Sequence, residues 1–189
     1  MAAIQQAGLF LVQFIFSLYA FLLVLRIWLR AVHADYYHPI VMSVAKLTTP
    51  VVKRFTFIAD IKSIECASVV LLFFITLIKL VLVSLIAGQV PHFSGLILWT
   101  LGTLLEVGLD TVFYMMMFMA LLSWIPHVQP TLFALLTQLT QPILQPVRRV
   151  LPLIAGMDFS AIVVLAVAQI LEILLAHPWI RIGLNAALH

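Results

Sequence analysis

The sequence predicts an all-α integral membrane protein with about four transmembrane helices, and its composition is the first reason. Of the 189 residues, 65% are hydrophobic and 9% are charged, whereas a soluble domain is about half apolar and about a quarter charged. So few charges cannot cover a water-exposed surface. The second reason is that several apolar runs approach the ~20 residues with which a helix crosses a bilayer.

Three of the spans have clear limits. They cover residues 9–29, 66–87 and 159–176, and each is close to the length of one helical crossing. The first eight residues contain no lysine or arginine, so we expect no cleavable signal peptide and a first span that stays in the mature protein.

The remaining span, the third in chain order, has an open start. It ends near Ile125 and begins at Gly102 or earlier, because the apolar stretch already starts near Phe93. Residues 93–103 therefore belong either to one long tilted helix or to a separate segment in the membrane interface.

The positions of lysine and arginine predict the orientation. Basic residues favour the cytoplasmic side of a membrane, and the two long connections hold seven of them, against Arg181 alone in the C-terminal tail. We therefore expect a multi-pass protein with both connections cytoplasmic and both termini outside. The net charge of +3 does not indicate nucleic-acid binding, because these residues flank apolar spans. The seven are Arg30, Lys46, Lys53, Arg54, Lys62, Arg148 and Arg149.

Both connections are too apolar for solvated loops and too rich in proline to span. Residues 40–47 and 132–139 show helix-like apolar recurrence with polar breaks, which is typical of amphipathic helices lying in the interface. We expect these helices to end at Thr49-Pro50 and Gln141-Pro142, since the residue before a proline avoids the helical conformation.

The landmarks of the two halves form an internal repeat, residues 1–92 and 93–189. Equivalent landmarks are offset by 92 to 96 residues. Two crossings per repeat place both copies in the same orientation, related by an axis along the membrane normal, so the fold is two parallel helical hairpins. The pairs are Trp28 with Trp124, Pro50 with Pro142, Glu65 with Asp158, and Lys79 with Glu172.

The most specific local motif frames two arginines with three prolines. Prolines at this spacing forbid one continuous helix, so the chain should follow the interface and then turn into the last span. The arginines would grip anionic lipid headgroups or a partner's carboxylate; the alternative is that they only set topology and snorkel to the headgroups. The motif comprises Pro142, Pro146, Arg148, Arg149, Pro152, Asp158 and Ser160, and its first-repeat counterparts are Arg26, Trp28, Pro50, Lys53, Arg54 and Glu65.

Two of these first-repeat residues lie near the end of the first span. Trp28 is typical of an interfacial anchor. Arg26 lies about one turn inside the span, where it either snorkels outward or pairs with an acid such as Glu65. Snorkelling is the interpretation that we favour from the sequence.

Four ionisable residues lie deeper in the spans, where each needs a partner or water. They are Lys79, Glu106, Asp110 and Glu172. Counted along each helix from its cytoplasmic end at ~1.5 Å per residue, Lys79, Asp110 and Glu172 lie at one depth in the membrane, and Glu106 lies one turn further out. The repeat makes Lys79 equivalent to Glu172, so we expect Lys79 to pair with Glu172 or Asp110; the alternative is that some of them face an outer vestibule or an oligomer contact.

Several segments resemble the YggT family, also called YlmG. They are Leu25 to Trp28, Asp35 to Pro39, Thr48 to Pro50, Ser123-Trp124 and Pro142 to Ser160. The resemblance implies an inner-membrane protein linked to osmotic and potassium stress, to cell division or envelope organisation, or in plastids to cytochrome assembly or nucleoid organisation. The first repeat departs from the family pattern, since it lacks the second and third prolines.

Catalytic and metal signatures are absent from the sequence. Glycine-rich phosphate loops, nucleophile elbows and His-Glu-x-x-His patterns do not occur. Cys66 is the only cysteine, which excludes an intrachain disulfide and a cysteine zinc site. His33, Asp35 and His38 are typical of an interfacial connection rather than of a metal site. We expect neither an enzyme nor a bound cofactor.

Two functions remain. The first is an ion path, or a regulator of one, that supports osmotic and potassium homeostasis; it depends on the charges inside the spans, and it would require a homo-oligomer because four helices hardly enclose a pore. The second is a scaffold whose Arg148-Arg149 motif recruits lipid or a cytoplasmic or membrane protein partner.

Overall fold

The computed structural model describes residues 2–55, 65–123, 129–150 and 160–188, and every element in these ranges is helical. Four helices are long and apolar enough to cross a membrane: Ala3–Ala31, Cys66–Ile86, Phe93–Leu122 and Ser160–Leu188. The predicted all-α membrane fold with four spans is thereby confirmed. In chain order the elements are α1 (Ala2–Ala31), α2 (Pro39–Val52), the 3₁₀ turn η1 (Lys53–Phe55), α3 (Cys66–Ile86), α4 (Phe93–Ser123), α5 (Pro130–Val150), α6 (Ser160–Leu171), the π-helical turn η2 (Glu172–Ala176) and α7 (His177–Leu188).

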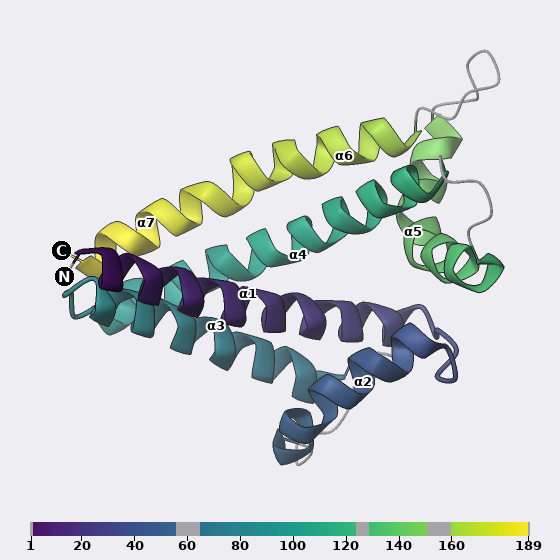
Figure 1. Ribbon diagram of the computed structural model, residues 1–189. Coiled ribbons are helices and arrows are strands. Elements are labelled where there is room, and N and C mark those ends of the chain that lie inside the picture. Colours follow the sequence, from purple (N-terminus) through teal and green to yellow (C-terminus); the bar gives the residue numbers. More distant parts are fainter. Residues whose placement is uncertain (1, 56–64, 124–128, 151–159, 189) are drawn as a thin grey trace.

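The spanning helices run side by side, and the shorter helices lie at one end of the bundle. Figure 1 shows both termini at one end, and α2 and α5 at the opposite end, where they cross the direction of the spans. This arrangement is the one that two parallel hairpins require, because each hairpin begins and ends on the same side. Many large apolar side chains are exposed on the spans, among them Ile4, Ile162 and Leu174, as expected for a surface that faces lipid.

The third span is a single helix. α4 begins at Phe93 and continues without interruption to Ser123, so residues 93–103 belong to the span rather than to a separate interfacial segment. α3 ends just before it, where Gly88 adopts a positive φ of 80°, a conformation that glycine tolerates without strain.

The fourth span is longer than the sequence predicted. The helical span passes from α6 through the π turn into α7, and the helix ends at Leu188 rather than at Ala176. Pro178 explains the turn: it has no amide hydrogen to donate to Leu174, and its ring displaces that carbonyl. A π turn absorbs the displacement while the helix continues.

Proline does not end the amphipathic helices, and that prediction is wrong. α2 continues past Pro50 to Val52, and α5 continues past Pro142 and Pro146 to Val150. All three proline side chains are exposed. Four residues separate Pro142 from Pro146, so both lie on the same face of α5, where a helix can bend without losing its buried contacts. Pro152, the third proline of the motif, lies outside the described residues.

Glycine allows α4 and α7 to approach closely. A Cβ atom on Gly95 would lie 2.1 Å from the Ala187 amide nitrogen, and one on Gly183 would lie 2.2 Å from the Trp99 nitrogen. A Cβ on Gly102 would lie 2.7 Å from the Ile180 nitrogen. Small residues that bring backbones together are the usual basis of helix association in membranes, and α4 is thereby held against the last span.

Candidate functional site

Polar side chains gather inside the bundle, between α1, α3 and α4. They line a cavity of about 700 Å³ together with aromatic residues of α1 and α4. The polar members are Gln13 and Ser17 of α1, Lys79 of α3, and Glu106 and Asp110 of α4. Three of these residues are ionisable, so the cavity brings charge into the membrane-spanning part of the protein, where charge marks functional positions.

A second cavity continues the polar region toward the end of the bundle that holds the termini. Its volume is about 400 Å³, and it shares Gln13, Lys79 and Glu106 with the first. It also reaches His177 and Arg181 of α7. The two cavities form one polar tract, with Glu106 and Lys79 at their junction.

Lys79 does not form the ion pair expected from the sequence. Its Nζ donates to Ser17 Oγ at 2.9 Å, and within the described ranges no ion pair joins it to Glu172 or Asp110. α4 packs against both α3 and the π turn, and so separates Lys79 from Glu172. The predicted direct pair is therefore wrong. Glu106 and Asp110 nevertheless line the same cavity as the Lys79 ammonium.

The repeat relates the two sides of this cavity. Gln13, Ser17 and Lys79 of the first half correspond, at an offset of 93, to Glu106, Asp110 and Glu172 of the second half. Neutral and basic residues in one copy thus occupy the positions of acids in the other. The sequence analysis found Lys79 and Glu172 but missed Gln13 and Ser17, which the same offset would have indicated.

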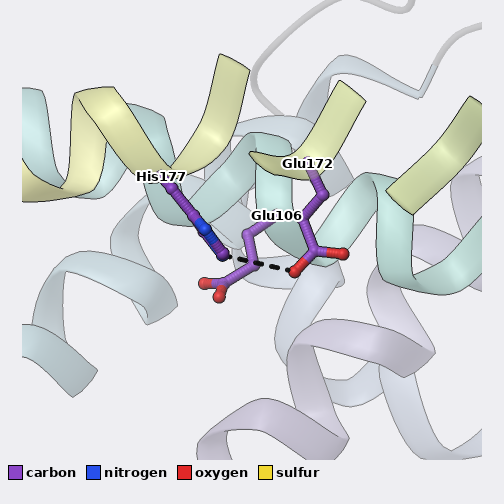
Figure 2. Close-up of side chains that lie close together, drawn as sticks. All are labelled: Glu106, Glu172 and His177. Atoms are coloured by element: carbon purple, nitrogen blue, oxygen red, sulfur yellow. Dashed lines mark ion pairs between the residues drawn. The ribbon is translucent and has the colours of Figure 1, made fainter. Parts of the chain in front are cut away.

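The π turn places a histidine beside two glutamates, as Figure 2 shows. His177 Nε2 lies 3.5 Å from Glu172 Oε1, and the other oxygen of Glu172 accepts a hydrogen bond of 2.9 Å from Gln169 Nε2. One donor atom from each of Glu106, Glu172 and His177 can be chosen so that all three lie within 4.8 Å of one another. His177 escaped the sequence analysis because the predicted span ended at Ala176.

A second polar cluster lies where α1, α2 and α3 meet, and Arg26 is at its centre. Arg26 Nε donates to Glu65 Oε2 at 2.6 Å and Nη2 donates to Oε1 at 2.8 Å. Nη1 donates to the Oγ1 atoms of Thr48 (2.8 Å) and Thr49 (2.9 Å). The side chain is 17% exposed. The favoured interpretation, that Arg26 snorkels, is therefore wrong; pairing with Glu65, the alternative, is what the structure shows.

Glu65 is held from several sides at the start of α3. Its Oε2 accepts a 2.5 Å hydrogen bond from Ser68 Oγ, and Arg30 Nη1 lies 2.8 Å from Oε1. Burial disfavours the ionised carboxyl, but the hydrogen bonds from Arg26 and Ser68 and the charges of Arg26 and Arg30 outweigh it, so the pKa of Glu65 is lowered. This cluster joins the first amphipathic helix to both spans of its hairpin.

Trp28 connects the two repeats. Its indole Nε1 donates to the Leu139 carbonyl of α5 at 3.0 Å, and Gln138 Nε2 donates to the Val32 carbonyl at 3.0 Å. In the second repeat the hydroxyl of Thr140, the counterpart of Thr48, lies 2.9 Å from Met119 Sδ. A thioether thus stands where the first repeat has the Arg26 guanidinium.

The remaining predicted residues are spread along the end of the bundle that holds α2 and α5. Arg148 and Arg149 are exposed in the last turn of α5, Lys53 and Arg54 are exposed in η1, and Ser160 is buried at the start of α6. Within the part of the chain that the structure describes, these basic residues line neither cavity of the polar tract. Trp124, Pro152 and Asp158 lie outside the described residues.

Comparisons with known proteins agree with the two halves of the fold. A family model described as CCB3/YggT matches the chain twice, over residues 5–86 and 98–179, which confirms the internal repeat; the boundary between residues 92 and 93 stays a prediction. No solved structure matches the chain.

Bacterial relatives cover most of the chain. A protein of Haemophilus influenzae, named only as uncharacterised, is 33% identical over 185 residues, which are 95% of this chain and 99% of the relative. "Uncharacterized protein YggT" of Escherichia coli K12 is 29% identical over 167 residues, 86% of each chain. "Uncharacterized protein in proC 3'region" of Vibrio alginolyticus is 32% identical over 157 residues, 82% of this chain and 85% of the relative.

Proposed function

This chain belongs to the CCB3/YggT family, and we propose that it is a non-enzymatic inner-membrane protein that supports osmotic and potassium homeostasis as an ion path or as a regulator of one. The observation that carries the proposal is the polar tract inside the bundle, where Lys79 faces Glu106 and Asp110 across a cavity of about 700 Å³. Ionisable residues at this depth usually serve the movement or sensing of ions.

The composition of the tract supports a cation as the ion. The two cavities are lined by two carboxylates of α4 and by neutral oxygen groups of α1, which are suitable ligands for a partly hydrated monovalent cation. Lys79 offers a mobile positive charge that a passing cation would displace. One side of the larger cavity is formed by Phe10 and Phe14, whose side chains are 66% and 56% exposed, so a closed path would need a second copy of the chain.

The test is potassium flux in liposomes that contain only this protein. Asp110→Asn removes a cavity charge, and we expect it to reduce the flux at least several-fold. Asp35→Asn is the matched control, because Asp35 is exposed in the connection after α1 and should leave the flux unchanged. Flux that is absent, or equal in the wild type and both variants, would contradict an ion path.

A scaffold is the second candidate function, and α5 is the observation that favours it. Arg148 and Arg149 are exposed in the last turn of an amphipathic helix, a position that suits contact with anionic lipid or with a partner's carboxylates. In a deletion strain exposed to osmotic shock, a scaffold predicts that Arg148→Ala with Arg149→Ala impairs survival more than Lys53→Ala with Arg54→Ala at equal membrane levels. Equal survival would assign these charges to topology alone.

A further inference from the structure

Glu106, Glu172 and His177 have the geometry of a metal site. Oxygen atoms of the two carboxylates and an imidazole nitrogen of His177 lie within 4.8 Å of one another, and Figure 2 shows the three side chains converging from α4 and from the two ends of the π turn. We propose that these residues bind one divalent transition-metal ion of the zinc class inside the membrane-spanning bundle.

The π turn supplies the geometry. Five residues separate Glu172 from His177, and in an α-helix they would point about 140° apart, because each residue turns the helix by about 100°. In a π turn, residues five apart are joined by a hydrogen bond, as the His177 amide is to the Glu172 carbonyl, and their side chains share a face. Pro178 causes the turn, so the sequence itself sets these two ligands side by side.

The chemistry of the three ligand atoms indicates which class of metal ion would bind. An imidazole with two carboxylates suits zinc and its neighbours, whereas magnesium and calcium prefer oxygen ligands alone. Zinc binds histidine nitrogen and carboxylate oxygen at about 2.0 to 2.2 Å in tetrahedral geometry, which places two ligand atoms about 3.3 to 3.6 Å apart. The 3.5 Å between His177 Nε2 and Glu172 Oε1 already matches this spacing, and small side-chain rotations would bring the Glu106 carboxylate, which lies within 4.8 Å of both, to the same spacing.

One ligand is already oriented by a neighbour. Gln169 Nε2 holds Glu172 Oε2 at 2.9 Å, which leaves Oε1 directed at His177. Groups behind metal ligands commonly fix them in this way. Access is provided by the cavity of about 400 Å³ that Glu106 and His177 line.

Charge balance also favours a bound cation. Glu106, Asp110 and Glu172 are three acids grouped near two basic side chains, Lys79 and Arg181. When all five are ionised, one negative charge remains, and uncompensated charge inside a membrane is costly. A cation bound by two of the acids would lower that cost.

The test is zinc binding by the purified full-length protein in detergent, measured by equilibrium dialysis and by calorimetry, with manganese and magnesium as comparison ions. We expect one zinc ion per chain, with much weaker magnesium binding. Glu172→Gln, Glu106→Gln and His177→Gln should each weaken zinc binding by about 100-fold or more, and Gln169→Ala by about 10-fold, as is typical of a group behind a ligand.

Matched controls separate this site from incidental binding. His92→Gln and Asp35→Asn change exposed residues far from the π turn in sequence and should leave the zinc affinity unchanged. Pro178→Ala, which allows the ordinary α-helical hydrogen bond to form, should weaken zinc binding without removing any ligand. Each variant is compared only if its helix content and elution match the wild type.

Three results would overturn the proposal: no zinc binding by the wild type, affinity unchanged in the folded Glu172→Gln and Glu106→Gln variants, or binding lost on replacement of His33 and His38 instead. The inference goes beyond the ion path of the proposed function, and the two can fail separately. Zinc binding without potassium flux would support the metal site and contradict the ion path. Potassium flux without zinc binding would support the ion path and contradict the metal site.

Discussion

Arg26 illustrates how a single basic side chain is accommodated near the end of a span. Its guanidinium donates to the Glu65 carboxylate and to two threonine hydroxyls of α2, so its fork geometry is matched by fixed acceptors. The Glu65 carboxylate is itself 8% exposed. A pair this well enclosed depends on both partners, because removing one leaves the other charge buried and uncompensated.

The first prediction is that Arg26 and Glu65 are energetically coupled. Glu65→Gln should lower the free energy of unfolding by about 3 kcal/mol, because it leaves the buried guanidinium without its counter-charge. Arg26→Met should be destabilising as well, and the double variant should lose clearly less than the two single losses together. Unfolding by SDS in mixed micelles measures all three, with Arg54→Met in η1 as the exposed control.

The pH dependence checks the same coupling. Because the folded-state pKa of Glu65 lies below its ordinary value of 4.5, the stabilisation is fully present above about pH 4.5 and is lost as the pH falls through the lowered value. The difference between wild type and Glu65→Gln should therefore shrink only in that acidic range. Additive single losses, or a difference that does not depend on pH, would contradict the pair.

The sequence identified most of the charged residues that the structure brings together but not their partners. A cation or an acid inside an apolar run is visible from composition alone, which is why Lys79, Glu106, Asp110 and Glu172 could be named. Which groups face them depends on the rotation and packing of the helices. Neutral partners such as Ser17, which accepts from Lys79, are common in membrane helices and are indicated only when the two repeats are aligned at an offset of 93.

At the level of elements, the close packing of α4 and α7 holds the last span, and with it the π turn, in place. Three glycines let the two backbones approach to distances that no side chain could occupy. The sequence showed the glycines without showing this contact, because Gly95 and Gly102 are seven residues apart and the segment that they meet, which contains Gly183, lies beyond the predicted end of the span. The continuation of α5 to Val150 was likewise not predicted, because the helix was expected to end at Pro142.

The second prediction is that this contact tolerates no side chain. A Cβ atom on Gly102 would lie 2.7 Å from the Ile180 backbone nitrogen and 2.8 Å from its Cγ1, so Gly102→Leu forces α4 and α7 apart. We expect a loss of roughly 3 kcal/mol or more, at the upper end of the cost of overpacking, measured as a lower midpoint of thermal unfolding in detergent.

Gly108 provides the matched control for this prediction. It lies in the same helix, and no atom lies within 4 Å of a Cβ placed on it. Gly108→Leu should therefore be close to neutral or slightly stabilising, since leucine favours a helix more than glycine does. Equal losses in the two variants would show that the α4–α7 contact does not limit stability.

On the scale of the whole molecule, the repeat could be predicted but the packing of its two copies could not. The offset between landmarks matches the two regions covered by the family model, and it follows from local patterns that recur in both halves. How the hairpins meet depends instead on side chains that differ between them. α4 packs against both spans of the first hairpin as well as α6 and α7, so a symmetric pairing of Lys79 with Glu172 does not form.

The third prediction concerns how the whole bundle sits in the membrane. Both amphipathic helices lie at one end and both termini at the other (Figure 1), and seven basic residues belong to the connections that include those helices, against Arg181 in the tail. The positive-inside rule then places α2 and α5 on the cytoplasmic side of the membrane.

In a Cys66→Ala background, single cysteines at Gln89 and Asn185, which are exposed at the terminal end, should react with an impermeant thiol reagent applied to intact spheroplasts. A cysteine at Gln129, exposed just before α5, should react only after the membrane is permeabilised. Protection of Gln89 and Asn185 together with labelling of Gln129 would invert the protein and move the Arg148-Arg149 motif outside the cell, where it could not recruit a cytoplasmic partner.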